Sequence, residues 1–342
     1  MSESASSSAA PRVRRGRLLR HGAAFAVLLA LVGYVVAQYA SGGRAVPRCT
    51  VRGPEGDGPS YELSAEQASN AATISAVGTT RGMPERAVTI ALATALQESG
   101  LRNISHGDRD SLGLFQQRPS QGWGTPRQIL DPVYASGKFY DHLAEVPGYS
   151  RLPLTVAAQR VQRSGFPQAY AKHEPDATLL ASALTGRSAA SLTCESREVP
   201  GAAEQDTADP GKLRSELVRA FGREVLPDQP GQEGQEGQEG GAGRAGAPSP
   251  LEVSVPVPAT AGTERVRTAD RGWELAHWAV ARADDLGIDR VSYGGRVWSA
   301  TASDEGWRRE KPKAAEGSGA SGSAGASDSA AAAEVRIRLA AP

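Results

Sequence analysis

The sequence predicts a mainly α-helical domain that is preceded by one transmembrane helix and followed, beyond a disordered linker, by a small α+β domain. Three observations carry this prediction. One uncharged apolar run lies near the N-terminus, helical periodicity fills the segment between the two cysteines, and strand-like alternation follows a Gly- and Pro-rich stretch. The expected parts are a basic tail, a membrane span, a helical domain, a linker and a C-terminal module, at 1–21, 22–40, 49–194, 199–270 and 271–342.

The apolar run at 22–40 is near the lower length limit for a helix that crosses a bilayer. The arginines before it are expected to keep the N-terminus in the cytoplasm and the bulk of the chain outside: Arg12, Arg14, Arg15, Arg17 and Arg20. A secretory signal cleaved near Ala37 is the alternative. The run is longer than the apolar region of a usual signal peptide, which favours an uncleaved anchor. We therefore expect a single-pass cell-membrane protein with the membrane as one partner.

The two cysteines, Cys49 and Cys194, bracket the helical segment. In an exported chain an even and minimal cysteine count predicts one disulfide, here joining the ends of that domain. Their spacing is unlike a metal or redox motif. Lys+Arg and Asp+Glu both number 38, so the net charge of zero gives no indication of nucleic-acid binding.

Two helices are predicted at the start of this domain. Ser64 and Gln67 have capping-box spacing, so the first helix begins there. The second begins at Pro84 and ends at Gly100, which suits a left-handed C-cap. Its apolar stripe repeats at three and four residues through Val88, Ala91, Leu92, Ala95, Leu96 and Ser99.

Glu98 lies at the edge of this stripe, in the last helical turn. A carboxylate there faces the negative end of the helix dipole, and partial burial removes water, so both effects raise its pKa. A carboxylic acid that stays neutral donates a proton in catalysis. A solvated glutamate with no chemical role is the alternative, because many helices carry one near the C-terminus.

The loop after this helix contains SLGLFQQ at 111–117. Glu98-Ser99 at a helix end, followed by Gly113–Gln116, resembles the Glu-Ser and Gly-Leu-Met-Gln signature of lytic transglycosylases with a goose-type lysozyme-like fold. The similarity covers about 60–194 and extends to exported lysozyme-like domains of actinobacteria. It implies a helical lobe with a groove for the glycan strand of peptidoglycan, and no cofactor.

The resemblance also implies residue roles. Glu98 would protonate the glycosidic oxygen between N-acetylmuramic acid and N-acetylglucosamine, and would then accept the proton of the sugar's primary hydroxyl. Tyr170 would correspond to the family's Tyr-Asn motif, although Ala171 stands where Asn would be, so Gln162 or Ser164 would supply the missing polar group. The implied substrate-binding residues are Ser99, Gly113, Gln116, Gln117, Gln162 and Tyr170.

A lysozyme-type hydrolase remains an alternative, because glycoside hydrolysis usually requires a second carboxylate. Asp108 and Asp110 follow Glu98 on a Gly-containing loop and are the candidates. Aspartate beside glycine also favours tight turns, which is the structural interpretation of both residues.

The remaining features of the domain indicate packing and a groove wall. N-cap residues followed by proline at 125–126 and 131–132 predict two further helices. Trp123 on a glycine-flanked loop either stacks on a sugar or fills the core. The spacing of the histidines is unlike that of a metal site, so no metal is expected.

The C-terminal module is predicted from a helix, a hairpin about Gly294-Gly295, a disordered insertion at 314–333 and a closing strand. This order is similar to a degenerate module on actinobacterial wall-lytic proteins that is related to zinc carboxypeptidases, whose last strand bears histidines. Here that strand carries Arg336 and Arg338, and His277 alone cannot hold zinc. We expect a zinc-free, non-catalytic module.

Two functional classes follow from the sequence. The first is a membrane-anchored, extracytoplasmic muralytic enzyme that acts through Glu98. The second is a lysozyme-like scaffold that binds glycan without cleaving it. An acid at the end of an apolar stripe favours the enzyme, because a binder has no need of one.

Overall fold

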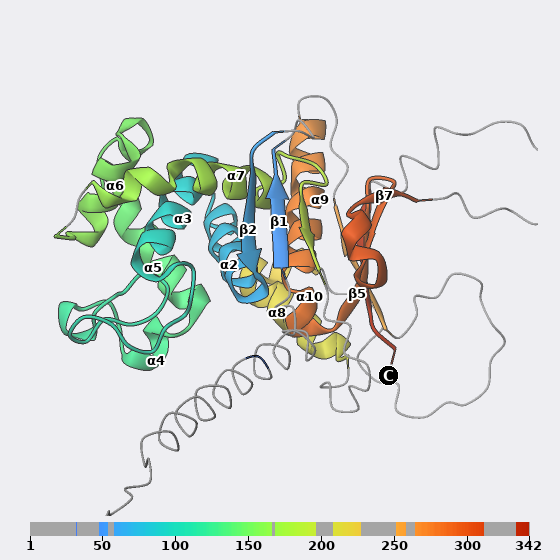
Figure 1. Ribbon diagram of the computed structural model, residues 1–342, viewed down its shortest axis with the longest axis horizontal. Helices are drawn as coiled ribbons and strands as arrows, with labels where there is room; N and C mark the ends of the chain where they lie inside the picture. The colour runs from blue at the N-terminus through green and yellow to red at the C-terminus, as the bar shows by residue number, and fades with distance from the viewer. Residues whose placement is uncertain are drawn as a thin grey trace, which may run out of the picture. The chain divides into compact units, whose positions relative to one another are not determined.

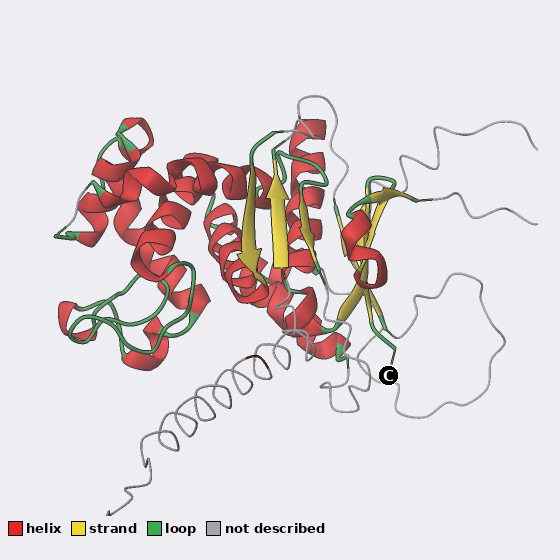
Figure 2. Ribbon diagram, in the orientation of Figure 1, coloured by secondary structure: helices red, strands yellow, loops and turns green. Residues whose placement is uncertain are grey.

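The protein is a mixed α/β structure with two antiparallel sheets (Figures 1 and 2). The computed structural model describes residue 32 and the ranges 48–53, 58–165, 168–195, 208–226, 251–257, 264–310 and 333–341, with backbone alone for 264–267. The predicted mainly α fold with a preceding transmembrane helix is therefore wrong. The strands β1 (Arg48–Arg52), β2 (Ser60–Ser64) and β3 (Leu192–Cys194) escape a periodicity search because each has at most 5 residues.

Three helices of the first part begin where the capping residues predict. The helices of this part are α2 (Ala65–Thr80), α3 (Glu85–Ser99), η1 (Pro119–Gln121), α4 (Pro126–Ile129), α5 (Pro132–Ala144), η2 (Tyr149–Arg151), α6 (Leu154–Gln162), η3 (Ala169–His173) and α7 (Glu174–Leu184). Ser64 and Gln67 form the predicted capping box of α2. Gly100 ends α3 in the left-handed conformation at φ 61°, and Thr125 and Asp131 cap α4 and α5.

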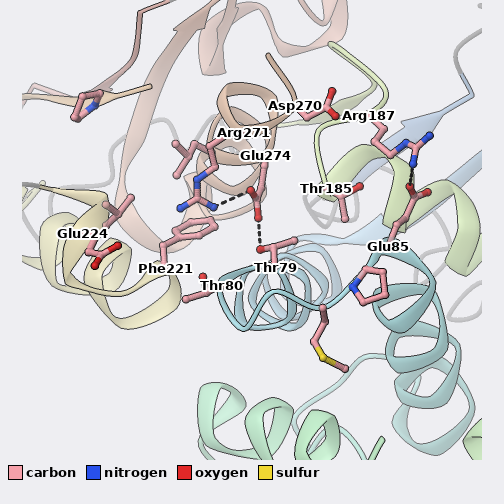
Figure 3. Close-up of a pocket in the computed structure, with 15 residues that line it drawn as sticks. Thr79, Thr80, Glu85, Thr185, Arg187, Phe221, Glu224, Asp270, Arg271 and Glu274 are labelled. Atoms are coloured by element: carbon pink, nitrogen blue, oxygen red, sulfur yellow. Dashed lines mark hydrogen bonds and ion pairs between the residues drawn. The ribbon is translucent and has the colours of Figure 1, made fainter. Parts of the chain in front are cut away.

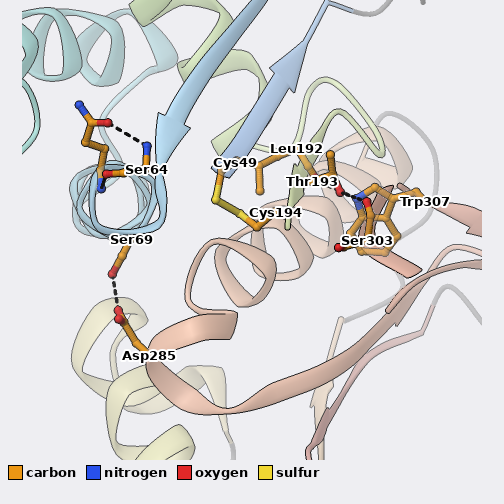
Figure 4. The surroundings of a disulfide bond; sticks show 10 residues. Cys49, Ser64, Ser69, Leu192, Thr193, Cys194, Asp285, Ser303 and Trp307 are labelled. Carbon is orange, nitrogen blue, oxygen red and sulfur yellow. Dashed lines mark hydrogen bonds between the residues drawn. A yellow bond between two sulfur atoms is a disulfide. The ribbon is translucent and has the colours of Figure 1, made fainter. Parts of the chain in front are cut away.

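The first sheet has the order β2-β1-β3 and joins the two ends of this part. Cys49 pairs with Cys194 across β1 and β3, and the predicted disulfide links them (Figure 4). The cross-link closes a loop of 145 residues in sequence. In the chain-entropy model a loop of this length stabilises the fold by about 4–5 kcal/mol.

The predicted transmembrane helix is not supported. Within the ranges that the structure describes, no helix combines the length and the apolar character that a bilayer crossing requires. The run at 22–40 lies outside the described residues apart from Val32, as does the basic tail at 1–21. The predicted single-pass topology and cell-membrane location are therefore not supported by the described residues.

The C-terminal part has a five-stranded sheet of order β4-β8-β5-β6-β7. Its elements are α8 (Pro210–Phe221), η4 (Arg223–Val225), β4 (Glu252–Pro256), α9 (Glu264–Ala281), α10 (Ala283–Leu286), β5 (Ile288–Tyr293), β6 (Arg296–Ser299), η5 (Ala300–Glu305), β7 (Arg308–Arg309) and β8 (Glu334–Leu339). The stretch at 199–270, predicted to be a linker, thus contains α8, β4 and the start of α9. The predicted insertion at 314–333 lies outside the described residues except for Ala333.

Helix α9 contacts β3 on one side and β5 and β8 on the other, so it joins the two sheets (Figure 1). His277 of α9 is fully buried and donates through Nδ1 to the Ala183 carbonyl at 2.7 Å, while its Nε2 accepts from the Ser191 amide at 3.3 Å. Trp307 Nε1 donates to the Leu192 carbonyl at 2.8 Å (Figure 4). The two parts therefore share one hydrophobic core.

Candidate functional site

Glu98 occupies the last turn of α3, where the buried stripe of the helix ends and the side chain becomes partly exposed. The hydroxyl of Tyr170, from η3, donates a hydrogen bond of 2.6 Å to Glu98 Oε1. Tyr170 is fully buried, so its ring is fixed behind the carboxyl group. The predicted acid thus accepts a short hydrogen bond from a residue that is distant in sequence.

Burial raises the pKa of Glu98, and hydrogen bonds from Tyr170 and Gln162 oppose that increase in part. The C-terminal end of α3 acts in the same direction as burial, because its dipole disfavours negative charge. Burial, and then the carboxyl group itself, raises the pKa of the Tyr170 hydroxyl. Tyr170 therefore remains a hydrogen-bond donor while Glu98 has the properties of a general acid.

The loop after α3 is tied to the helix by side chains that the sequence singled out. Ser99 Oγ donates to the Leu114 carbonyl at 2.8 Å and to Ala95 at 3.1 Å. Gln162 Nε2 donates to the Phe115 carbonyl at 2.7 Å. These bonds hold the loop against α3 and α6, so Ser99 positions the backbone beside Glu98.

Glycine is required at the centre of this loop. Gly113 has φ 74°, and a Cβ atom there would lie 2.7 Å from the Ile129 carbonyl oxygen. Gln116 also has a positive φ, 48°, and its Nε2 donates to the Gly113 carbonyl at 3.3 Å. Gln117 is buried and donates to the Ala135 carbonyl at 3.0 Å. Of the two predicted glutamines in this loop, Gln116 lines the groove described next and Gln117 does not.

A groove of about 790 Å³ contains the candidate acid. Five of the predicted residues line it, namely Glu98, Asp108, Gln116, Gln162 and Ser164. The sequence had left the role of Trp123 open, and it lines the groove with its ring 4.3 Å from that of His142. The lining residues that sequence reasoning missed include Arg118, His142, Glu145, Arg160 and Arg163. Exposed charged residues on unrelated helices carry no sequence signal that would have grouped them.

The two candidate second carboxylates differ in their surroundings. Asp110 accepts from Arg118 Nε at 2.7 Å and from the Ser120 amide at 2.9 Å. Hydrogen bonds from Ser120 and from Arg118 hold the pKa of this carboxyl well below its usual range. Asp110 is therefore a turn residue, whereas the exposed Asp108 lines the groove with Glu98.

A larger cavity, of about 900 Å³, lies at the other end of α3 and shares no lining residue with the groove (Figure 3). Glu274 lies buried in its wall, where it accepts from Thr79 and pairs with Arg271 at 2.8 Å. Burial raises the pKa of Glu274, while Arg271 and Thr79 oppose the increase. Arg187 pairs with Glu85 at its edge, at 3.0 Å. Asp270 and Glu224 also line this cavity. The groove is the stronger candidate for chemistry, because it contains Glu98 with its hydrogen bond from Tyr170.

Among the residues that the structure describes, no cluster of three His, Cys, Asp or Glu side chains is arranged to hold a metal ion. His277 is also unsuited to be a ligand, because its two ring nitrogens bond to backbone groups. Burial lowers the pKa of His277 to about 4.

A protein-family model matches part of the chain. Residues 214–318 match the family model described as the VldE C-terminal domain. The match runs from α8 past β7, so the C-terminal part is similar to that domain and no zinc carboxypeptidase match accompanies it. A search of curated proteins found no match. The first part, at 48–194, lies outside the matched range, so its resemblance to lytic transglycosylases has no support from these comparisons.

Proposed function

We propose that the Glu98 groove cleaves the glycan strand of peptidoglycan between N-acetylmuramic acid and N-acetylglucosamine. One observation carries the proposal. A partly buried carboxyl group with a raised pKa is hydrogen-bonded to a buried tyrosine in a groove of about 790 Å³. A groove of this size accommodates several sugar units of a polymer, and a raised carboxyl pKa suits proton donation near neutral pH.

The proposed reaction needs one acid–base group. Glu98 gives its proton to the glycosidic oxygen as the bond from that oxygen to C1 of the muramoyl sugar breaks. The primary hydroxyl of the same sugar then attacks C1, and its proton passes to Glu98. The products are a free 4-hydroxyl on one fragment and a 1,6-anhydro-muramoyl end on the other, and Glu98 is protonated again.

Tyr170 supports both steps in this scheme. Its hydroxyl donates to the carboxylate that exists between them, and its raised pKa keeps the proton on the tyrosine. Gln116 and Gln162 place amide groups in the groove beside the acid. Amides of this kind bind the hydroxyl and acetamido groups of sugars by hydrogen bonds.

A hydrolase is the second candidate, and it depends on Asp108. Hydrolysis would use a second carboxylate to activate water or to attack C1. The ion pair between Asp110 and Arg118 removes Asp110 from that role. Asp108 is exposed in the groove and remains available.

The decisive experiment replaces Glu98 by Gln in the full chain and analyses the muropeptides released from purified sacculi by mass spectrometry. The amide keeps the shape of the side chain but cannot transfer a proton, so we expect release to fall by about a hundredfold or more. Glu62→Gln is the matched control, because Glu62 is an exposed residue of β2 that pairs with Arg48 and does not line the groove.

The products separate the candidates. Anhydro ends from the wild-type protein support the transglycosylase, and reducing ends that disappear in Asp108→Asn support the hydrolase. Undiminished release by a folded Glu98→Gln protein would exclude Glu98 from the mechanism. Glycan binding without any release would indicate the scaffold.

A further inference from the structure

Two arginines line the groove without an ion pair among the described residues. Arg118 contacts Asp110 at 2.7 Å. Glu145 lies 3.7 Å from His142, whose imidazole carries a charge only when it is protonated. Apart from Glu98, this leaves Asp108 and Glu145 as anions and Arg160 and Arg163 as cations. Both arginines lie at the C-terminal end of α6, so positive charge is concentrated at that part of the groove.

The position of Arg163 is fixed by an unfavourable backbone conformation. It ends α6 at φ 51° and ψ 38°, the left-handed region that glycine and asparagine usually fill at this point of a helix. Its amide donates to the Gln159 carbonyl at 2.8 Å, and Gln159 Nε2 donates to the Ser164 carbonyl at 2.8 Å. The Cβ atom of a non-glycine residue is disfavoured in this region. Unfavourable conformations of this kind concentrate at functional sites.

Both arginines flank Gln162, which ties α6 to the backbone beside Glu98. Any polymer bound across Glu98 therefore passes the end of α6 that carries them. A neutral polysaccharide offers hydroxyl and acetamido groups, which do not require a fixed cation. Guanidinium groups instead match carboxylates, with two parallel N–H donors per pair.

We propose that Arg160 and Arg163 bind carboxylates carried by the muramoyl residues of the strand, so that the groove selects carboxylate-bearing glycan over neutral chito-oligosaccharides. The inference rests on the proposed function and adds the substrate class. The carboxylate has two possible sources. In a strand without peptides it is the lactyl group of the muramoyl sugar, and in a peptide-bearing strand it belongs to the peptide.

The test measures binding to the full-length Glu98→Gln protein, which does not consume the ligand. The probes are chitohexaose, glycan strands stripped of peptides by an amidase, and peptide-bearing strands. For Arg160→Gln combined with Arg163→Gln, we expect the Kd for carboxylated strands to rise about three- to tenfold, since two exposed ion pairs are lost. The Kd for chitohexaose should not change. Arg151→Gln, an exposed arginine of η2 outside the groove, is the control.

Ionic strength gives a second readout that a structural role would not affect. Added salt should weaken binding of carboxylated strands to the parent protein, and the double variant should lose that dependence. If the substitutions and added salt weaken binding of the stripped strands, the bound carboxylate is the lactyl group. If they weaken binding of peptide-bearing strands alone, the bound carboxylate belongs to the peptide.

Two results would overturn this inference but not the proposed function. One is an equal Kd for carboxylated strands in the parent protein and the double variant. The other is a rise in the Kd for chitohexaose as large as the rise for carboxylated strands. Absence of binding and cleavage for every glycan by the wild-type protein would overturn it together with the proposed function. If the wild-type protein cleaves the strands and the arginine substitutions do not change the Kd for carboxylated strands, the proposed function holds and only the inference fails.

Discussion

The hydrogen bond between Tyr170 and Glu98 gives the sharpest prediction for a single residue. In the wild-type protein, the hydrogen bond from the Tyr170 hydroxyl lowers the pKa of Glu98. Tyr170→Phe removes this hydrogen bond. The pKa of Glu98 should therefore rise in the variant. Activity that requires the protonated acid falls as pH increases through that pKa, so the descending limb of the pH profile should move to higher pH.

The same substitution should slow the reaction at the optimum by about tenfold, because a hydrogen bond to a charged group is lost as the proton is transferred. The pH dependence of muropeptide release measures both effects. Tyr149→Phe is the control, because Tyr149 of η2 does not line the groove. An unshifted limb would show that the hydroxyl does not act on Glu98.

The residues of the site were predictable to different degrees. Glu98 stands out in the sequence because the end of an apolar helical stripe is a local feature. The contact with Tyr170 depends on how η3 packs on α3, and the resemblance alone suggested it. Arg160 and Arg163 had no local signal, since an exposed arginine on a helix is ordinary.

The elements were predictable where capping residues define them and were missed where strands are short. Ser64, Thr125 and Asp131 cap helices because their side chains satisfy free backbone amides, which is a local effect. The three-stranded sheet depends instead on pairing between Cys49 and Cys194, far apart in the chain. The helix α8 was missed because the glycine-rich composition around it indicated a linker.

The loop between α3 and α4 offers a test of how an element positions the site. Gly113→Ala adds a Cβ atom 2.7 Å from the Ile129 carbonyl in a left-handed conformation. Gly122→Ala is the matched control, because Gly122 has φ 82° with no atom within 4 Å of the added Cβ. The control should lose about 1 kcal/mol of unfolding free energy from backbone strain alone.

Gly113→Ala should lose about 2–3 kcal/mol of unfolding free energy, because the steric clash with the Ile129 carbonyl adds to the backbone strain. It should also lose activity, since the carbonyl of Gly113 anchors Gln116. Urea unfolding of both variants measures the difference. Equal losses would show that the loop moves aside at little cost and does not define the groove.

At the scale of the whole molecule, the two parts are joined by polar contacts buried within a common core. The sequence predicted a zinc-free module separated by a linker, in which His277 had no assigned role. Its actual role depends on α9 packing against the end of α7, a long-range contact that no local pattern reveals.

This contact predicts a dependence of stability on pH. Burial lowers the pKa of His277 from 6.5 to about 4 in the folded protein. Between these values the unfolded chain binds a proton that the folded protein excludes, so stability falls as pH decreases through this range. The stability that depends on a neutral His277 is fully present above about pH 6.5 and is largely lost near pH 4. It amounts to roughly a few kcal/mol of unfolding free energy.

His277→Gln isolates this effect, because the glutamine amide offers one donor for Ala183 and one acceptor for the Ser191 amide without titrating. Glu98 and Glu274 titrate in both proteins, so the difference between wild type and variant cancels their contributions. Urea unfolding from pH 7 to pH 4 should show the wild type losing stability relative to His277→Gln, while His106→Gln, at an exposed position, follows the wild type. Parallel curves for wild type and His277→Gln would mean that His277 accepts a proton without disturbing the junction, and that the two parts are held together by their apolar contacts alone.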